Sequence, residues 1–312
     1  MLLAGGPPAM ADAYPGHPVK LVLPFPAGSA TDGVSRYLAE HLRNGLGQVV
    51  FIENLPGADG IIAAQAVKRA PPDGYTLMVS TNSAHGTNRA LYPKLPYDPE
   101  KDFEPVGAVM RIPQLLVVRK DFPANDIAGL VRVIKERAGN KPYSFGTGNT
   151  SSRIAGELLK QAAGLDMANV PYRGTPQALQ DLVGGQIDLF FADPFAAAPL
   201  IDGGQIKALA ITDKQRLPQM PNVPTMSEAG YKSVEVVSWA GVFAPAHTSP
   251  AIVERLNSEI GRVLATPQAQ EFIRKMGAAP LTMKPAEFRV FVASEISRWG
   301  KLVEVAGIPK VQ

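Results

Sequence analysis

The feature that most constrains the fold of this chain is an alternation of short β-branched runs with amphipathic stretches, which begins at Val19. Runs of this kind read as strands, with helical patterns between most of them. The predicted strands cover residues 19–25, 49–53, 76–80, 115–118, 143–146, 169–172, 187–191 and 206–212. Such alternation predicts an α/β fold with mostly parallel sheet and helices on both faces.

The pattern changes after a last predicted strand at 234–243, because the rest of the chain is almost wholly helical. Ser249 is a good N-cap ahead of Pro250, and helices are predicted over 250–265, 267–276 and 285–305. A chain of 312 residues is long for a single core. We therefore predict a first domain of residues 12–112 plus 240–312 and a second of 113–239, with hinges at 114–118 and 236–243.

Composition excludes several classes of function. Hydrophobic residues make up 46% and charged residues 19%, and the net charge of +3 is scattered without a basic block, so no nucleic-acid partner is expected. The chain has no cysteine, which excludes disulfides, thiolate metal sites and cysteine nucleophiles.

The first eleven residues predict export. Residues 1–6 resemble the end of an apolar segment, and Ala9-Met10-Ala11 has the small-x-small pattern that signal peptidase recognises. We therefore interpret residues 1–11 as a signal-peptide remnant. No later stretch reaches the roughly 18 uninterrupted apolar residues of a membrane span. The mature protein is expected to be soluble and periplasmic.

Two strand-to-helix loops are the candidate binding elements. The first is Pro24–Asp32, whose small residues allow close approach to the backbone and which opens a helix predicted to begin near Thr31. Free N–H groups at a helix N-terminus favour an anion. The alternative is that Thr31 or Asp32 simply caps this helix.

The second loop is Phe145–Arg153, which follows a strand and opens a helix predicted over 153–163. It offers hydroxyl groups, one amide and the same free N–H groups. If both sheets direct their carboxyl ends to one cleft, the two loops face each other there. A negatively charged guest would then be held by helix dipoles and neutral hydrogen bonds, without an obligatory arginine–carboxylate pair.

An α/β enzyme acting on a carboxylate or nucleotide is the competing hypothesis. Gly146-x-Gly148-x-x-Ser151 resembles a dinucleotide fingerprint, but it lacks the third glycine, and no acidic residue ends the strand at 169–172. Nucleophile elbow, P-loop and zinc-protease motifs are absent from the sequence. Of the histidines only His85 follows a strand, where it either lines a pocket or is exposed. We expect a non-enzyme without metal or cofactor.

The loops and their flanks together resemble the Bug family, the extracytoplasmic solute receptors of tripartite tricarboxylate transporters. The resemblance runs in register from about residue 14 to 300. It is carried by Tyr14-Pro15, Pro24–Asp32, Asn54–Gly60, Pro72–Leu77, Leu95–Asp98, Lys101–Phe103, Val170–Gly174, Leu182–Asp188, Ala208–Thr212, Pro221–Thr225, Glu228–Gly230 and Trp239–Gly241.

The resemblance implies a type II periplasmic-binding fold, two α/β domains joined by two crossover segments around a central cleft. It implies a monomer that captures a dicarboxylate, an acidic amino acid or an aromatic acid and passes it to membrane permease subunits; a receptor that signals occupancy to a sensor kinase is the alternative. Backbone N–H groups and ordered water would hold the proximal carboxylate. The implied ligand-binding residues are Phe25, Ala27, Gly28, Ser29, Thr31, Asp32, Ser80, Thr81, Ser83, His85, Thr147, Gly148, Asn149, Thr150, Ser151, Arg153, Tyr172 and Asp193.

Three positions carry open alternatives. Many relatives have Gly-Gly where this chain has Gly28-Ser29, so a serine hydroxyl competes for ligand or water. Many relatives have histidine where Arg153 stands, and this arginine is either a solvated first-turn residue or a cation for a second ligand carboxylate. Asp193 either orients part of the ligand or caps the helix that begins at Pro194.

Overall fold

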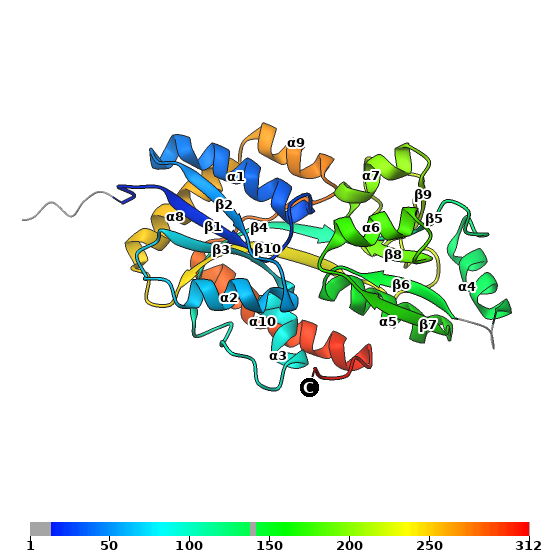
Figure 1. Ribbon diagram of the computed structural model, residues 1–312. Coiled ribbons are helices and arrows are strands. Elements are labelled where there is room, and N and C mark those ends of the chain that lie inside the picture. Colours follow the sequence, from blue (N-terminus) through cyan, green and yellow to red (C-terminus); the bar gives the residue numbers. More distant parts are fainter. Residues whose placement is uncertain (1–13, 138–141, 312) are drawn as a thin grey trace, which may run out of the picture.

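The computed structural model describes residues 14–137 and 142–311, so the predicted signal-peptide remnant lies outside the described residues (Figure 1). The strands are β1 (Val19–Leu23), β2 (Val50–Asn54), β3 (Thr76–Thr81), β4 (Phe103–Pro113), β5 (Leu115–Arg119), β6 (Tyr143–Thr147), β7 (Met167–Pro171), β8 (Leu189–Ala192), β9 (Ile206–Ile211), β10 (Val237–Pro245) and β11 (Ala279–Pro280). The helices are α1 (Ala30–Leu46), α2 (Ile61–Lys68), α3 (Asn88–Leu91), α4 (Ile127–Glu136), α5 (Thr150–Ala163), α6 (Thr175–Val183), α7 (Pro194–Asp202), α8 (Pro250–Leu264), α9 (Pro267–Lys275) and α10 (Pro285–Val305), with short turns η1 (Ala58–Gly60) and η2 (Ser83–Thr87).

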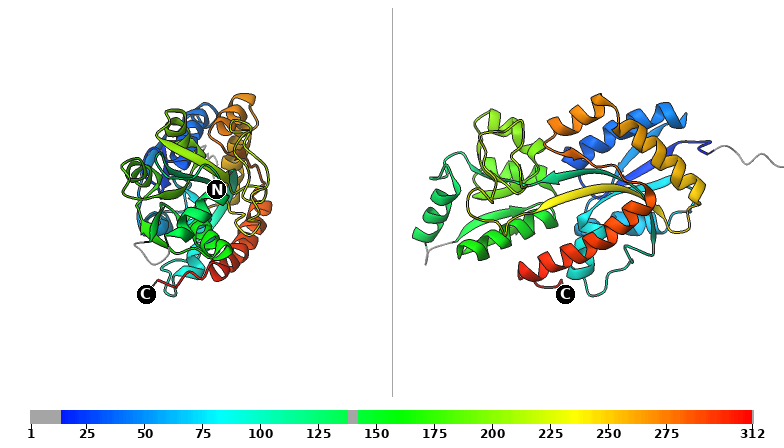
Figure 2. Two further views of the ribbon diagram at one scale, coloured as in Figure 1. Left: turned by 90° about the vertical axis from the view of Figure 1, so that its right-hand side faces the viewer. Right: turned by 180° about the vertical axis from the view of Figure 1, so that it is seen from behind.

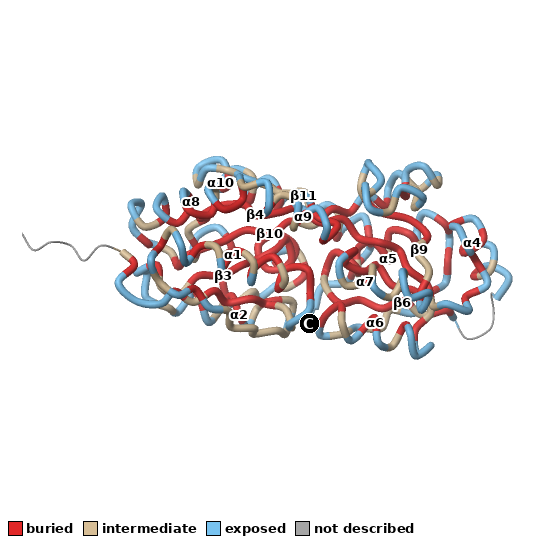
Figure 3. The backbone as a smooth tube through the Cα atoms, turned by 90° about the horizontal axis from the view of Figure 1, so that it is seen from above, coloured by how far each residue is buried: buried red, intermediate tan, exposed pale blue. Residues whose placement is uncertain are grey.

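These strands form two separate sheets. The first has the order β11-β4-β10-β3-β1-β2, and the second has the order β7-β6-β8-β5-β9. Each sheet carries helices and lies in its own lobe, which we call the first and the second lobe (Figure 1). Buried residues fill the interior of each lobe, while exposed residues follow the outer helices (Figure 3).

The chain passes between the lobes twice, and the two passages are tied together. Strand β4 of the first sheet continues through Gln114 into β5 of the second, and the chain returns from the second lobe into β10 (Figure 2). The Gln114 N–H donates to Thr212 Oγ1 at 2.8 Å, and the Thr212 hydroxyl donates to the Val236 carbonyl at 2.5 Å. These bonds hold the two passages side by side, at the position a hinge would need.

The sheets are mixed, so the prediction of mostly parallel sheet was wrong. Strand β1 pairs in parallel with β2 and β3, and β6 with β7 and β8. The strands at the passages are antiparallel to their neighbours, since β10 runs against β3 and β4, and β5 runs against β8 and β9. A strand that enters a sheet from the other lobe does not come from a strand–helix–strand unit, and nothing constrains it to run parallel.

The C-terminal helices return to the first lobe. Helix α8 packs on α1 and β4, and α10 packs on β4 and η2. The end of α10 also reaches the second lobe, because Trp299 and Val303 belong to the same buried cluster as Leu158 of α5. The predicted domain boundaries at 112/113 and 239/240 stay a prediction.

Candidate ligand-binding site

A polar cavity lies between the lobes, which we call the inner cavity. Its volume of about 20 Å³ admits one or two water-sized groups, such as the two oxygens of a carboxylate. Both lobes contribute to its wall. The lining residues are Phe25, Ser29, Thr31, Thr81, Asn82, Ser83, Ile112, Asn149, Ser151, Asp193 and Ser238.

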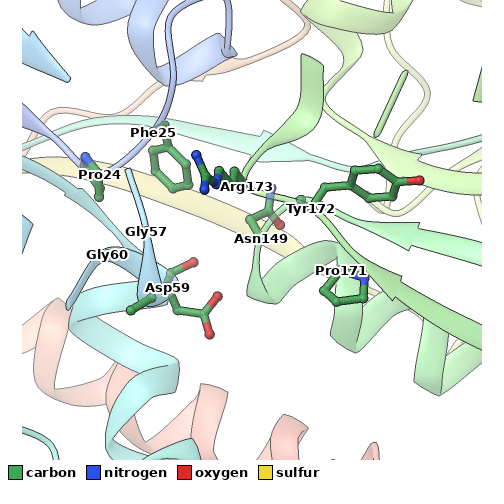
Figure 4. Close-up of a pocket in the computed structure, with 12 residues that line it drawn as sticks. Pro24, Phe25, Gly57, Asp59, Gly60, Asn149, Pro171, Tyr172 and Arg173 are labelled. Carbon is green, nitrogen blue, oxygen red and sulfur yellow. The ribbon is translucent and has the colours of Figure 1, made fainter. Parts of the chain in front are cut away.

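A larger outer cavity of about 280 Å³ lies beside it (Figure 4). It shares Phe25, Ser83 and Asn149 with the inner cavity, so the two form one cleft. The outer cavity has space for the body of a small organic molecule whose polar end occupies the inner cavity. Its lining residues are Pro24, Phe25, Gly57, Ala58, Asp59, Gly60, Ser83, Gly148, Asn149, Pro171, Tyr172 and Arg173.

The N-terminus of α1 forms one wall of the inner cavity. The helix begins at Ala30 and is capped by Ser29, whose Oγ accepts from the Asp32 N–H at 3.2 Å. The alternative that Thr31 or Asp32 caps the helix was therefore wrong, because Ser29 is the N-cap and accepts from the third N–H of the helix. The N–H groups of Ala30 and Thr31, the first two of the helix, have no acceptor within the helix. The Ala30 N–H donates to the Asp193 carboxyl, and the Thr31 N–H is left to meet an anion.

Asp32 faces away from the cavity and fixes the loop before α1. Its carboxylate accepts from Arg36 Nε at 2.9 Å, from Asn54 Nδ2 at 3.0 Å and from the Gly28 N–H at 3.1 Å. Burial raises the pKa of Asp32, but the hydrogen bonds from Arg36, Asn54 and Gly28 outweigh burial and hold that pKa below its usual value. The carboxylate is thus kept ionised by its own lobe.

The N-terminus of α5 forms the opposite wall. Asn149 caps the helix by accepting from the Ser152 N–H at 2.8 Å, and Ser152 Oγ accepts from the Asn149 N–H at 3.2 Å. This reciprocal cap starts the helix at Thr150, three residues before the predicted start at Arg153. The N–H groups of Thr150 and Ser151 are left without an acceptor in the helix.

Hydrogen bonds join this helix start to the first lobe. Asn82 Nδ2 donates to Ser151 Oγ at 3.0 Å, and Thr150 Oγ1 lies 2.9 Å from Ser83 Oγ and 3.1 Å from Thr87 Oγ1. We call Asn82, Ser83, Thr87, Thr150 and Ser151 the interlobe cluster. All its members are buried and neutral. Asn82 Oδ1 also accepts from Ser238 on the returning strand β10.

Asp193 lies in the wall of the inner cavity, with 8% of its surface exposed. It precedes α7, but its side chain makes no capping hydrogen bond there; it accepts instead from Thr175 Oγ1 at 2.8 Å. Burial raises the pKa of Asp193, and the hydrogen bonds from Thr175, Gln114 and the Ala30 N–H oppose this only in part.

His85 lies in the core and does not line either cavity, which corrects both readings of this residue. Its side chain is fully buried, its Nδ1 is 2.6 Å from Ser80 Oγ, and its ring stacks on Phe243 with centroids 3.9 Å apart. Burial lowers the pKa of His85 to about 3, so the ring is neutral. The π-helical turn that follows β3 directs this side chain inward.

Arg153 is also absent from both cavity walls. Its Nε is buried without a hydrogen-bond partner. Its positive charge acts to lower the pKa of Tyr92, whose hydroxyl donates to Asp59. Tyr172 lines the outer cavity, but its hydroxyl points away and donates to Asp181 (Figure 4). The predicted residues that line neither cavity are Ala27, Gly28, Asp32, Ser80, His85, Thr147, Thr150 and Arg153.

Sequence reasoning missed several lining residues. Asn82 follows β3 between the predicted residues Thr81 and Ser83, but it was not itself predicted. Ile112 and Ser238 come from the two passages between the lobes, where no loop motif signals them. Asp59 and Arg173 each belong to a quoted motif, Asn54–Gly60 and Val170–Gly174, and both line the outer cavity.

Two further properties bear on function. Across residues 14–137 and 142–311, the longest apolar helical stretches fall short of what a bilayer crossing requires. Within the same ranges, His, Asp and Glu side chains do not gather in threes where a metal ion would fit.

Two α/β lobes joined by two passages, with a polar cavity between them, define a periplasmic-binding-protein fold. The family model for the receptor of the tripartite tricarboxylate transporter family matches residues 34–308, and the chain belongs to this family. BugT of Bordetella pertussis is 34% identical over 301 residues, which cover 96% of this chain and 92% of BugT.

Solved structures agree with the family assignment. An R. palustris protein solved with adipate superposes with a TM-score of 0.92 at 35% identity, covering 96% of this chain and all of that one. The periplasmic binding protein BugD gives 0.90 at 36%, with the same coverage. MatC from Rhodopseudomonas palustris, solved with bound malate, gives 0.85 at 36% and covers 93% of this chain and all of its own. The predicted family and fold class are confirmed.

Proposed function

We propose that this protein binds a small carboxylate between its lobes and delivers it to the membrane subunits of a tripartite tricarboxylate transporter. One observation carries the proposal: two helix N-termini meet at a single cavity, and the N–H groups of Thr31 on α1 and of Thr150 and Ser151 on α5 have no acceptor within their helices. The described residues that line this cavity include neither lysine nor arginine. Helix dipoles and neutral donors suffice to hold a carboxylate there.

The relatives support a dicarboxylate as the first candidate. Adipate and malate are the compounds named with two solved relatives. The inner cavity would take one carboxylate, and the outer cavity would take the rest of the molecule next to Arg173 and Asp59. Acidic amino acids and aromatic acids fit the same geometry and belong in any ligand panel.

The remaining parts of the proposal follow from the family. The protein would act in the periplasm as a monomer, without a cofactor and without chemical turnover. The two lobes would be domains that close by bending at Gln114 and near Val236, where the passages are bonded together. Presentation of the occupied protein to a sensor kinase is a second candidate, because it would use the same closed surface.

A thermal-shift screen tests the proposal, with malate, adipate, aspartate, glutamate and benzoate as the panel. A compound present at 100 times its Kd should stabilise the protein by about 2.7 kcal/mol. Calorimetry would then give Kd, and mass spectrometry of the recovered compound should find it unchanged. Failure of every carboxylate to bind, or recovery of an altered product, would contradict the proposal.

A further inference from the structure

Asp193 places an acid where the ligand's carboxylate is proposed to bind. Among the described residues that line the inner cavity, it alone has an ionisable side chain. A carboxylate in so small a space lies within a few ångströms of Asp193. Two ionised carboxylates at that separation repel strongly, and in proteins one of them usually keeps a proton.

Neutral donors, not charged ones, contact the Asp193 carboxyl: they are Thr175, Gln114 and the Ala30 N–H. Burial is the largest influence on the pKa of Asp193 and raises it. The charged or titratable groups on the elements packed around Asp193 are Asp32, Arg36, Glu40, His41 and Arg43 on α1, Glu104 and Arg111 on β4, Arg119 on β5, Arg173 just before α6 and Asp181 on it, Asp202 on α7, and Glu271, Arg274 and Lys275 on α9.

The surroundings of Asp193 also suit a neutral carboxylic acid. Thr175 donates to one carboxyl oxygen, and Oε1 of the nearby Gln114 is buried without a donor. The Gln114 amide here donates to Asp193, and a half-turn of that amide would bring its oxygen to the hydroxyl of a protonated Asp193. Gln114 connects β4 to β5, so the state of this acid is linked to the passage between the lobes.

We propose that Asp193 takes up one proton from solvent when an amine-free carboxylate binds, so that the closed cavity holds the ligand carboxylate beside a neutral acid. In this step the ionised Asp193, the ionised ligand carboxylate and one proton from solvent combine into one complex, in which Asp193 carries the proton. Asp193 thereby determines specificity. An amino acid whose ammonium group reaches this aspartate brings its own positive charge and binds without the proton. The inference rests on the proposed function.

Calorimetry in two buffers tests proton uptake in the unmodified protein. Malate and adipate are titrated at pH 7 in phosphate and in Tris, whose ionisation enthalpies differ, and the difference in observed heat gives the number of protons bound. We expect close to one proton for each of these acids that binds. Binding with no proton exchanged would overturn the inference while leaving the proposed function intact, whereas failure of all carboxylates to bind would contradict the proposed function itself.

The Asp193→Asn variant supplies the matched test, because the amide keeps the size of the acid and is neutral at every pH. In the unmodified protein, one proton is bound together with the ligand. The Kd should therefore rise about tenfold for each pH unit above the pKa that Asp193 has in the ligand-free protein. In Asp193→Asn the profile between pH 6 and pH 8 should be flat. The exposed Asp166→Asn in the same lobe is the control and should keep the slope. An unchanged slope in Asp193→Asn would overturn the inference.

Discussion

The loops before α1 and α5 present the same groups to the cavity but are held in opposite ways. The α1 loop is fixed within its own lobe by an ionised aspartate with an arginine and an asparagine around it. The α5 loop is held by a neutral cap, and its hydroxyl groups bond across the cleft to the first lobe. One loop is therefore preset, while the other can complete its bonds only when the lobes meet.

This difference assigns the loops different tasks. A loop stiffened by ionic hydrogen bonds holds its N–H groups in place before the ligand arrives, so little conformational entropy is lost on binding. Neutral hydrogen bonds between lobes are individually weak and reversible, which suits a contact that forms and breaks at each closure. We infer that the first lobe recognises the carboxylate and the α5 loop then secures closure.

The largest effect is expected from removing the charge that presets the first loop. Asp32→Ala should weaken binding of the tightest carboxylate about 30-fold, or about 2 kcal/mol, within the range for hydrogen bonds that involve a charged group. Asp32→Asn should lose less, since its amide still accepts one of the bonds. Calorimetry measures both, and Glu271→Ala, which breaks an exposed pair with Lys275, is the control. Wild-type affinity in both Asp32 variants would show that the network is dispensable.

Acid should affect two buried groups, His85 in the core and Asp32 in the preset α1 loop, at different pH. The folded pKa of His85, about 3, lies below its unfolded value, so its stabilising contribution is complete above about pH 6.5 and declines as the pH falls towards 3. Asp32, whose pKa is lowered from that of an ordinary aspartate, loses its contribution only below about pH 4.

Urea unfolding at pH 7 and pH 5 checks this ordering. The free energy of unfolding should fall by about 2 kcal/mol from the His85 contribution, at roughly 1.4 kcal/mol for each pH unit below 6.5. His85→Gln, which cannot take up a proton, should remove this part of the fall, whereas Asp32→Asn should retain it. An equal fall in His85→Gln would mean that another group titrates.

A smaller loss of affinity is expected from substitutions in the interlobe cluster. Asn82→Ala removes bonds to Ser151 and Ser238 and should weaken binding about tenfold, since one to two net hydrogen bonds are worth about 1.4 kcal/mol. Small-angle scattering should find the liganded variant more open than the unmodified protein.

Two substitutions of Thr150 provide a matched pair of variants for the interlobe cluster. Thr150→Val keeps the shape but not the bonds to Ser83 and Thr87, while Thr150→Ser keeps the hydroxyl. Only the valine variant should follow Asn82→Ala, and equal behaviour of the two would assign the effect to packing.

The sequence alone predicted the positions of the two strand-to-helix loops, because each loop combines a strand end, small residues and a helix start. It located the helix starts less well, since Ser29 and Asn149 are caps only once the backbone turns at them. Strand β4 was not predicted, because Pro105 and Gly107 interrupt its pattern, although pairing with β10 overrides both. His85 was misplaced because a strand-end position does not reveal that the next turn is π-helical. Asn82 and Ser238 meet only through tertiary contacts.

The most direct test of shared recognition is the amide NMR spectrum of ¹⁵N-labelled protein titrated with the tightest-binding carboxylate. The account predicts that the N–H signals of Ala30 and Thr31 on α1, and of Thr150 and Ser151 on α5, shift together and saturate at the same Kd. Shifts confined to one helix, or to a surface away from the inner cavity, would contradict it.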